Sequence, residues 1–175
     1  MDNEKCFVNK KGGFVPEVYA LSGVGNSGKT TTLRIVKEEL LKKYPNAVVK
    51  DLAPKNKIVI NGVKKRVVIV SRGDAEVYME IDFSHIVSIE LCDVIFCACR
   101  SKGGSLKFVK HLASPNQVHI IKKQKDASSD AANGTFIKVP LSDSDFSRLT
   151  QNSDDYKHVW TLDEIIQYFV GIGFD

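Results

Sequence analysis

The sequence predicts a three-layer α/β/α sandwich built on a mainly parallel sheet, with a β-hairpin at about residues 57–70. Nearly continuous apolar runs of strand length alternate with segments of helical periodicity, as expected when helices cover both faces of a parallel sheet. The chain has 175 residues, of which 43% are hydrophobic and 26% charged. This composition is typical of one globular domain, here residues 1–175.

The order of the elements follows from the same patterns. Strands are predicted over residues 18–21, 47–49, 57–60, 63–70, 94–99 and 118–121, with an edge strand over 135–139. Helices are predicted over residues 29–44, 75–90 and 106–112. Asn61-Gly62 is the turn dipeptide that favours the hairpin. Thr161 and Glu164 form a capping box, which predicts a last helix through about Val170.

Charge and cysteine usage exclude several classes of protein. The net charge of +4 permits an anionic ligand but is not a dense basic stripe. Cys6, Cys92, Cys97 and Cys99 lack the paired spacing of a zinc site, so we expect reduced thiols in the core. The first residues contain no apolar signal segment, and no apolar run is long enough to span a membrane. We therefore expect a cytoplasmic protein.

One segment carries a specific chemical signal. Gly23-Val24-Gly25-Asn26-Ser27-Gly28-Lys29-Thr30 matches the pattern G-x-x-x-x-G-K-S/T in full, between a predicted strand and a predicted helix. Its glycines let successive backbone N–H groups converge on phosphate oxygens, and the helix start adds a positive dipole end. A turn that only joined strand to helix would not need Gly-Lys-Thr at this register. The segment, continued by Thr31, is predicted to bind a nucleoside triphosphate.

The motif and the alternating β–α pattern, over about residues 18–121, resemble the P-loop NTPase superfamily. The resemblance implies that Lys29 reaches the β- and γ-phosphates and that the Thr30 hydroxyl binds Mg²⁺. Asn26 stands where the superfamily's small kinases usually have glycine, so the loop is more similar to ATPase-type loops. ATP is favoured over GTP, because the run Lys122-Lys123-Gln124-Lys125-Asp126 does not match the guanine-reading spacing. We interpret this run as part of a solvated, polar surface loop.

The resemblance also implies an aspartate at the end of a buried strand, to hold Mg²⁺ directly or through water. Ser71 occupies that position after the strand at 67–70. Asp74 is the first candidate for the missing metal ligand, and capping of the next helix explains it equally well. Asp51, which ends an earlier strand, is the other candidate acid, with a role in the turn before Pro54 as its alternative.

Arg72 and Arg100 each follow a central strand, so either guanidinium could bind a phosphate and stabilise charge on the group being transferred. For each, a surface arginine in a loop is the alternative. Ligands in α/β folds bind at the carboxyl ends of the strands. The catalytic residues expected to meet there are Lys29, Asp74, Asp51, Arg72 and Arg100.

Three functions remain open. The first is Mg²⁺-dependent hydrolysis of ATP (or GTP), and the second is transfer of the γ-phosphate to a small-molecule or nucleotide acceptor. The third is a non-enzymatic nucleotide-dependent switch or assembly module, suggested by the missing aspartate at Ser71. Crowded lysines between Lys102 and Lys125 leave a nucleic-acid partner open, but no interleaved aromatic residues support one. The four histidines, His85, His111, His119 and His158, show no metal spacing.

Overall fold

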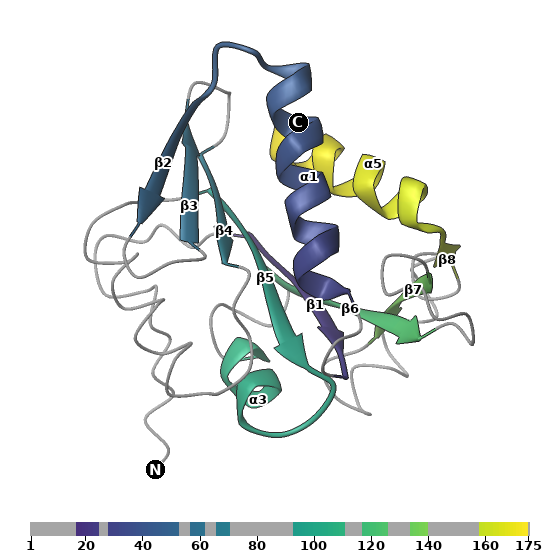
Figure 1. Ribbon diagram of the computed structural model, residues 1–175. Coiled ribbons are helices and arrows are strands. Elements are labelled where there is room, and N and C mark those ends of the chain that lie inside the picture. The colour runs from purple at the N-terminus through teal and green to yellow at the C-terminus, as the bar shows by residue number, and fades with distance from the viewer. Residues whose placement is uncertain are drawn as a thin grey trace.

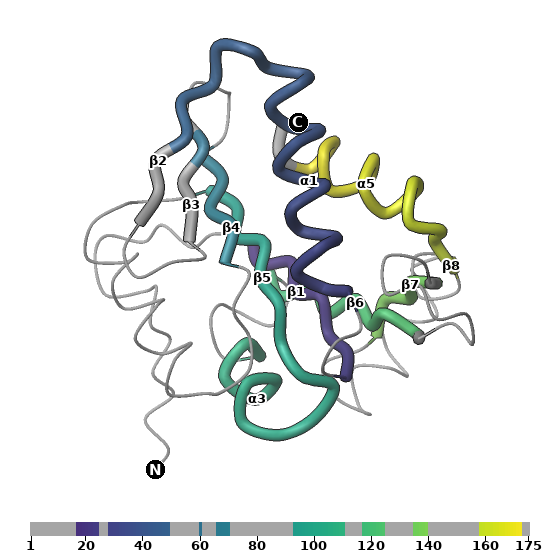
Figure 2. Tube along the Cα trace, viewed as in Figure 1, coloured from purple at the N-terminus to yellow at the C-terminus, as the bar shows by residue number. Residues whose placement is uncertain are grey.

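The computed structural model describes residues 17–24, 28–52, 57–61, 66–70, 93–110, 117–125, 134–139 and 158–174 (Figure 2). These residues form a mixed α/β fold around one sheet of eight strands, in the order β2-β3-β4-β5-β1-β6-β7-β8 (Figure 1). The predicted helix at 75–90 lies outside the described residues.

The bounds of the elements agree with the predicted ranges to within a few residues in most cases. The strands are β1 (Glu17–Gly23), β2 (Val48–Leu52), β3 (Lys57–Asn61), β4 (Val67–Val70), β5 (Val94–Arg100), β6 (Val118–Lys125), β7 (Gly134–Val139) and β8 (Val159–Trp160). The helices are α1 (Lys29–Lys43), α3 (Gly104–Lys110) and α5 (Leu162–Phe174). The short strand β8 was not predicted; it pairs with β7, so β7 is not the edge strand that was expected.

The centre of the sheet is parallel. Strands β4, β5, β1 and β6 pair in parallel, while β3 and β7 run antiparallel to β4 and β6. Because β2 and β8 are in turn antiparallel to β3 and β7, six of the eight strands point the same way. This confirms the prediction of a mainly parallel sheet. The apolar run Val67–Val70 is buried throughout, as expected for a strand covered on both faces.

The predicted hairpin forms, but its register differs from a tight turn at Asn61-Gly62. That turn would pair Ile60 with Val63, whereas Ile60 lies opposite Val67. A tight turn would draw the charged residues 64–66 into a central strand, where burial of charge is costly. The apolar residues that follow them form β4 instead.

Alternate residues of the central strands enter two separate hydrophobic layers. Tyr19 and Leu21 pack with the buried faces of α1 and α5, which lie side by side over the sheet (Figure 1). Val18 and Ala20 point the other way and pack with Phe108 of α3. Residues of β1 therefore contribute to both hydrophobic layers.

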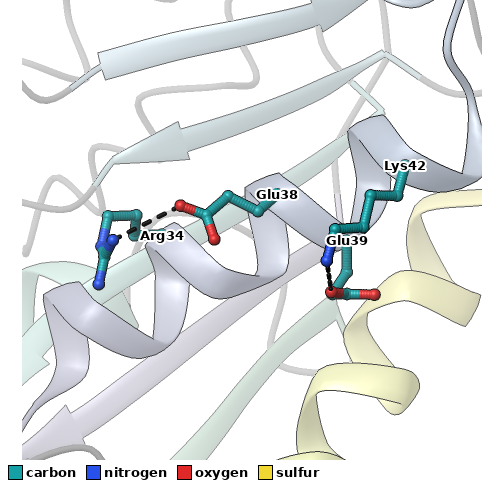
Figure 3. A network of polar contacts seen from close by, with 4 residues as sticks. All are labelled: Arg34, Glu38, Glu39 and Lys42. Carbon is teal, nitrogen blue, oxygen red and sulfur yellow. Dashed lines mark hydrogen bonds and ion pairs between the residues drawn. The ribbon is translucent and has the colours of Figure 1, made fainter.

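The exposed face of α1 carries two ion pairs (Figure 3). The Arg34 guanidinium lies 3.5 Å from the Glu38 carboxylate, and the Lys42 ammonium donates to Glu39 over 2.8 Å. The hydrogen bond to Glu39 raises the pKa of Lys42 above its ordinary value. Because solvent-exposed pairs of this kind contribute little, the buried side of α1 holds the helix on the sheet.

The predicted capping box starts α5. The backbone N–H of Thr161 donates to the Glu164 carboxylate over 2.8 Å, and the N–H of Glu164 donates to the Thr161 hydroxyl over 3.3 Å. Two helix-start N–H groups are thereby satisfied within the chain. The helix runs to Phe174, about one turn beyond the predicted end.

Replacing Thr161 with alanine is expected to lower the free energy of unfolding by about 1 kcal/mol, because the Glu164 amide loses its acceptor. Urea denaturation measures this change. Thr135→Ala is the matched control, because the exposed Thr135 hydroxyl caps no helix and bonds an exposed glutamine side chain. Equal losses in the two variants would contradict a specific role for the cap.

Candidate phosphate-binding site

The candidate site begins where β1 ends and α1 starts. Gly28, the residue before α1, has φ 85° and ψ 18° in the left-handed region. Residues with a Cβ rarely adopt this conformation, which explains the glycine at this position of the motif. Gly25, Asn26 and Ser27 lie outside the described residues. The described part of the loop is thus anchored by β1 on one side and by a glycine turn on the other.

Lys29 folds back over the start of the loop. Its ammonium donates to the carbonyl oxygens of Gly23 over 2.7 Å and of Val24 over 2.9 Å. The side chain is largely buried, with a relative exposure of 9% for the residue. These bonds join the first turn of α1 to the end of β1 and fix a positive charge at the loop.

The residue before α1 provides no side-chain cap. Gly28 offers no side-chain hydrogen bond, and the first turn contains no acidic residue. The first backbone bond of the helix runs from the Thr32 N–H to the Gly28 carbonyl, over 2.9 Å. In α5, by contrast, a capping box fills this role. The start of α1 therefore has the character of an anion-binding site.

Arg100 lies next to the loop on the neighbouring strand. It is the register partner of Gly23, and its side chain is exposed. Its backbone N–H donates to the hydroxyl of buried Ser105 over 3.0 Å, which ties the end of β5 to α3. On the other side of β1, Lys122 of β6 pairs with Ser22 and is also exposed. Of the five predicted catalytic residues, Lys29 and Arg100 both lie beside Gly23, Lys29 through its side-chain bond and Arg100 through the strand register.

The predicted acids are not brought to the loop by the described residues. Asp51 lies on β2, which β3, β4 and β5 separate from β1, or roughly 19 Å across the sheet at the usual strand spacing. The register also places it level with Tyr19, well below the end of β1. Ser71, Arg72 and Asp74 lie outside the described residues. The strand before them, β4, is separated from β1 by β5.

Lys123 was assigned to a solvated run, and this interpretation is wrong for that residue. Strand β6 continues through Lys125, and within it Lys122 and Gln124 are exposed while Lys123 is only 3% exposed. The Lys123 ammonium lies 5.7 Å from the centroid of the Phe136 ring, its cross-strand neighbour on β7. Buried and exposed residues alternate with a period of two from Ile121 onward, and this alternation could have revealed that Lys123 is buried.

The cysteines on β5 are free and buried, as predicted for Cys97 and Cys99. Burial raises the pKa of the Cys97 thiol well above its ordinary value and raises that of Cys99 to about 12, although the charges of Lys29 and Lys110 oppose the second shift. Both thiols therefore stay protonated and unreactive at neutral pH. Lys29 and Lys110 thus act on the same thiol. Cys6 and Cys92 lie outside the described residues.

The two histidines that the structure describes lie elsewhere. His119 stacks on Tyr19 with ring centroids 4.5 Å apart, and its Nε2 lies 2.8 Å from the Glu17 carboxylate, at the opposite end of β1 from the loop. His158 contacts Trp160. Within the described ranges, no three histidine, cysteine or acidic side chains gather as a metal-binding cluster. His85 and His111 lie outside these ranges.

No protein-family model, curated protein or solved structure matches this chain. In the described part of the chain, no helix combines the length and apolarity needed to cross a membrane. The candidate function therefore rests on the chemistry of the residues around the loop.

Proposed function

We propose that this chain is a P-loop nucleoside triphosphatase that hydrolyses ATP with Mg²⁺, on a three-layer α/β/α sandwich. The observation that carries the proposal is the Lys29 ammonium, held by the carbonyl oxygens of Gly23 and Val24 beside the start of α1, where Gly28 provides no side-chain cap. A cation in this position, next to converging backbone N–H groups, is suited to the phosphates of a nucleotide. The motif itself supplies the specificity for a triphosphate.

The residues at the loop are compatible with Mg²⁺ and a triphosphate. Mg²⁺ keeps several waters and takes one or two protein oxygens together with phosphate oxygens. The hydroxyl of Thr30, an exposed residue, would be one of these ligands, and Asp74 is proposed as the second. Bound Mg²⁺ would neutralise phosphate charge. Lys29 would bind the β- and γ-phosphates, and Arg100 would stabilise charge that develops on the γ-phosphate.

Hydrolysis is preferred over phosphate transfer to an acceptor. The kinase alternative assigned Asp51 or Asp74 to the acceptor hydroxyl, and Asp51 lies on β2, three intervening strands from β1. A transferase would also need a second binding site, for the acceptor. None of the distances given above for the described residues indicates such a site. A cytoplasmic location is proposed because the two thiols on β5 are free.

Two measurements on the same protein test this function: binding of a fluorescent ATP analogue and release of inorganic phosphate from ATP. We expect Mg²⁺-dependent binding of the ATP analogue, competition by ATP stronger than by GTP, and phosphate release without any added acceptor. Phosphate release that requires a nucleoside, nucleotide or sugar would replace hydrolysis with the kinase reaction. Tight binding without turnover would indicate a switch, and absence of binding at millimolar nucleotide would exclude all three.

A further inference from the structure

The net positive charge of this chain comes from one segment. Residues 94–125 contain seven of the 25 lysines and arginines and none of the 21 aspartates and glutamates. The remaining residues carry 18 basic and 21 acidic side chains, so they are acidic although the whole chain has a charge of +4. Such asymmetry indicates a polyanionic partner more clearly than the net charge does.

The fold places this segment on both sides of the loop strand. It forms β5, α3 and β6, and β5 and β6 are the two neighbours of β1. Arg100 ends β5 opposite Gly23, and Lys122 on β6 pairs with Ser22. The backbones of Arg100 and Lys122 are thus about two strand spacings, or ~10 Å, apart across the end of β1. Positive charge therefore continues from β5 to β6 past the P-loop.

Helix α3 extends this charge. Lys102 precedes the helix, and Lys107 and Lys110 lie one turn apart on it; Lys102 and Lys107 are exposed and Lys110 is half-buried. The backbone N–H of Arg100, the register partner of Gly23, donates to the hydroxyl of Ser105 on α3 over 3.0 Å, which holds the start of α3 at the end of β5. We call Lys102, Lys107, Lys110 and Lys122 the basic surface.

The described acids at the ends of the central strands lie away from the basic surface. Glu17 begins β1 and Asp93 precedes β5, so both lie at the amino ends of these strands. Gly23 lies six residue steps after Glu17 along the strand, or roughly 20 Å away. Around the carboxyl ends, the described charged side chains of β5, α3 and β6 are all basic.

We propose that the basic surface binds the phosphate backbone of double-stranded nucleic acid, beside the P-loop. Single strands are typically held by exposed aromatic rings that stack on their bases. In the described part of the segment, both phenylalanines, Phe96 and Phe108, are buried. Lysines contact phosphates without reading sequence, and a duplex presents phosphates without requiring stacked bases.

Fluorescence polarisation with a labelled 20-base-pair duplex of mixed sequence tests the proposal. Neutralisation of four phosphates gives a slope of log K against log salt of about −3.6, so affinity falls about 150-fold between 50 and 200 mM salt. Lys102→Gln and Lys122→Gln are each expected to reduce the slope by about 1, and a shuffled duplex is expected to bind equally well. Lys42→Gln, which removes the same charge from the far end of α1, is expected to bind like the unmodified protein.

Three results would overturn the proposal: no duplex binding at 50 mM salt, tighter binding of the single strand, or equal weakening in the Lys42 variant. The last result would mean that overall charge rather than this surface attracts the duplex. Binding of the ATP analogue is measured in the same variants and should be unchanged by Lys102→Gln and Lys122→Gln. A chain that binds the analogue but no duplex would refute the basic surface alone, and the reverse would refute only the proposed nucleotide function.

Discussion

Replacing Lys29 with methionine is expected to reduce the proposed ATP hydrolysis by about 100- to 1,000-fold, because the variant loses the charged donor that we propose for the transferred phosphate. Methionine keeps most of the volume of the lysine side chain. It cannot donate the hydrogen bonds of 2.7 and 2.9 Å that the Lys29 ammonium makes to the carbonyl oxygens of Gly23 and Val24. The variant therefore loses the positive charge of Lys29 and both of its hydrogen bonds to the start of the loop. Phosphate release at saturating Mg²⁺ and ATP, with analogue binding measured in parallel, gives the size of the effect.

Lys37→Met is the matched control for this change. Lys37 lies two turns further along α1, away from the loop, so its variant should hydrolyse ATP normally. Circular dichroism of both variants checks that the fold is retained, because carbonyls left without a donor can cost about 1–3 kcal/mol of stability. Normal hydrolysis in the folded Lys29 variant would rule out the loop as the phosphate site.

The largest loss of stability is expected from Phe169→Ala. The Phe169 side chain on α5 is fully buried, and its ring centroid lies 4.9 Å from that of Phe96 on β5 and 6.1 Å from that of Tyr19 on β1. Truncation leaves a cavity between the helix and the two central strands. Large-to-small changes of this kind cost about 3–5 kcal/mol, a large share of the total stability of most domains.

Equilibrium denaturation in urea measures this loss, with Gln167→Ala as the control on the same helix. Gln167 is exposed, so its replacement should change the free energy of unfolding by less than about 0.5 kcal/mol. A loss below about 1 kcal/mol for Phe169→Ala would show that α5 does not pack on the sheet as described.

Strands were predictable where the chain is apolar without interruption. Val67–Val70 and Val94–Cys99 are buried on both faces of the sheet, so nothing polar breaks the pattern that reveals them. The start of α5 was predictable for a local reason, since the capping box lies within four consecutive residues. The first helix followed from its apolar periodicity and from the loop motif before it.

Strand order was not predictable, because local patterns identify strands but not their neighbours. The insertion of β5 between β1 and β4, and of three strands between β1 and β2, depends on packing between distant segments. Asp51 was therefore expected in the crevice although β2 lies at the edge of the sheet. Lys123 was missed because its charged neighbours hid the alternation, and its long apolar stem allows burial against Phe136. The second Mg²⁺ ligand, with Asp74 first, remains a prediction.

The position of β1 in the sheet has a consequence for how this protein folds. Glu17 pairs with Val94 and Val18 with Val118, so the partners of the loop strand lie roughly 75 and 100 residues further along the chain. During synthesis, β1 and the loop emerge before β5 and β6, and β1 gains its second neighbouring strand only after residue 122 has been made. Closing such long loops is slow. We therefore expect the proposed phosphate-binding loop to form late in folding, after β5 and β6 have enclosed β1.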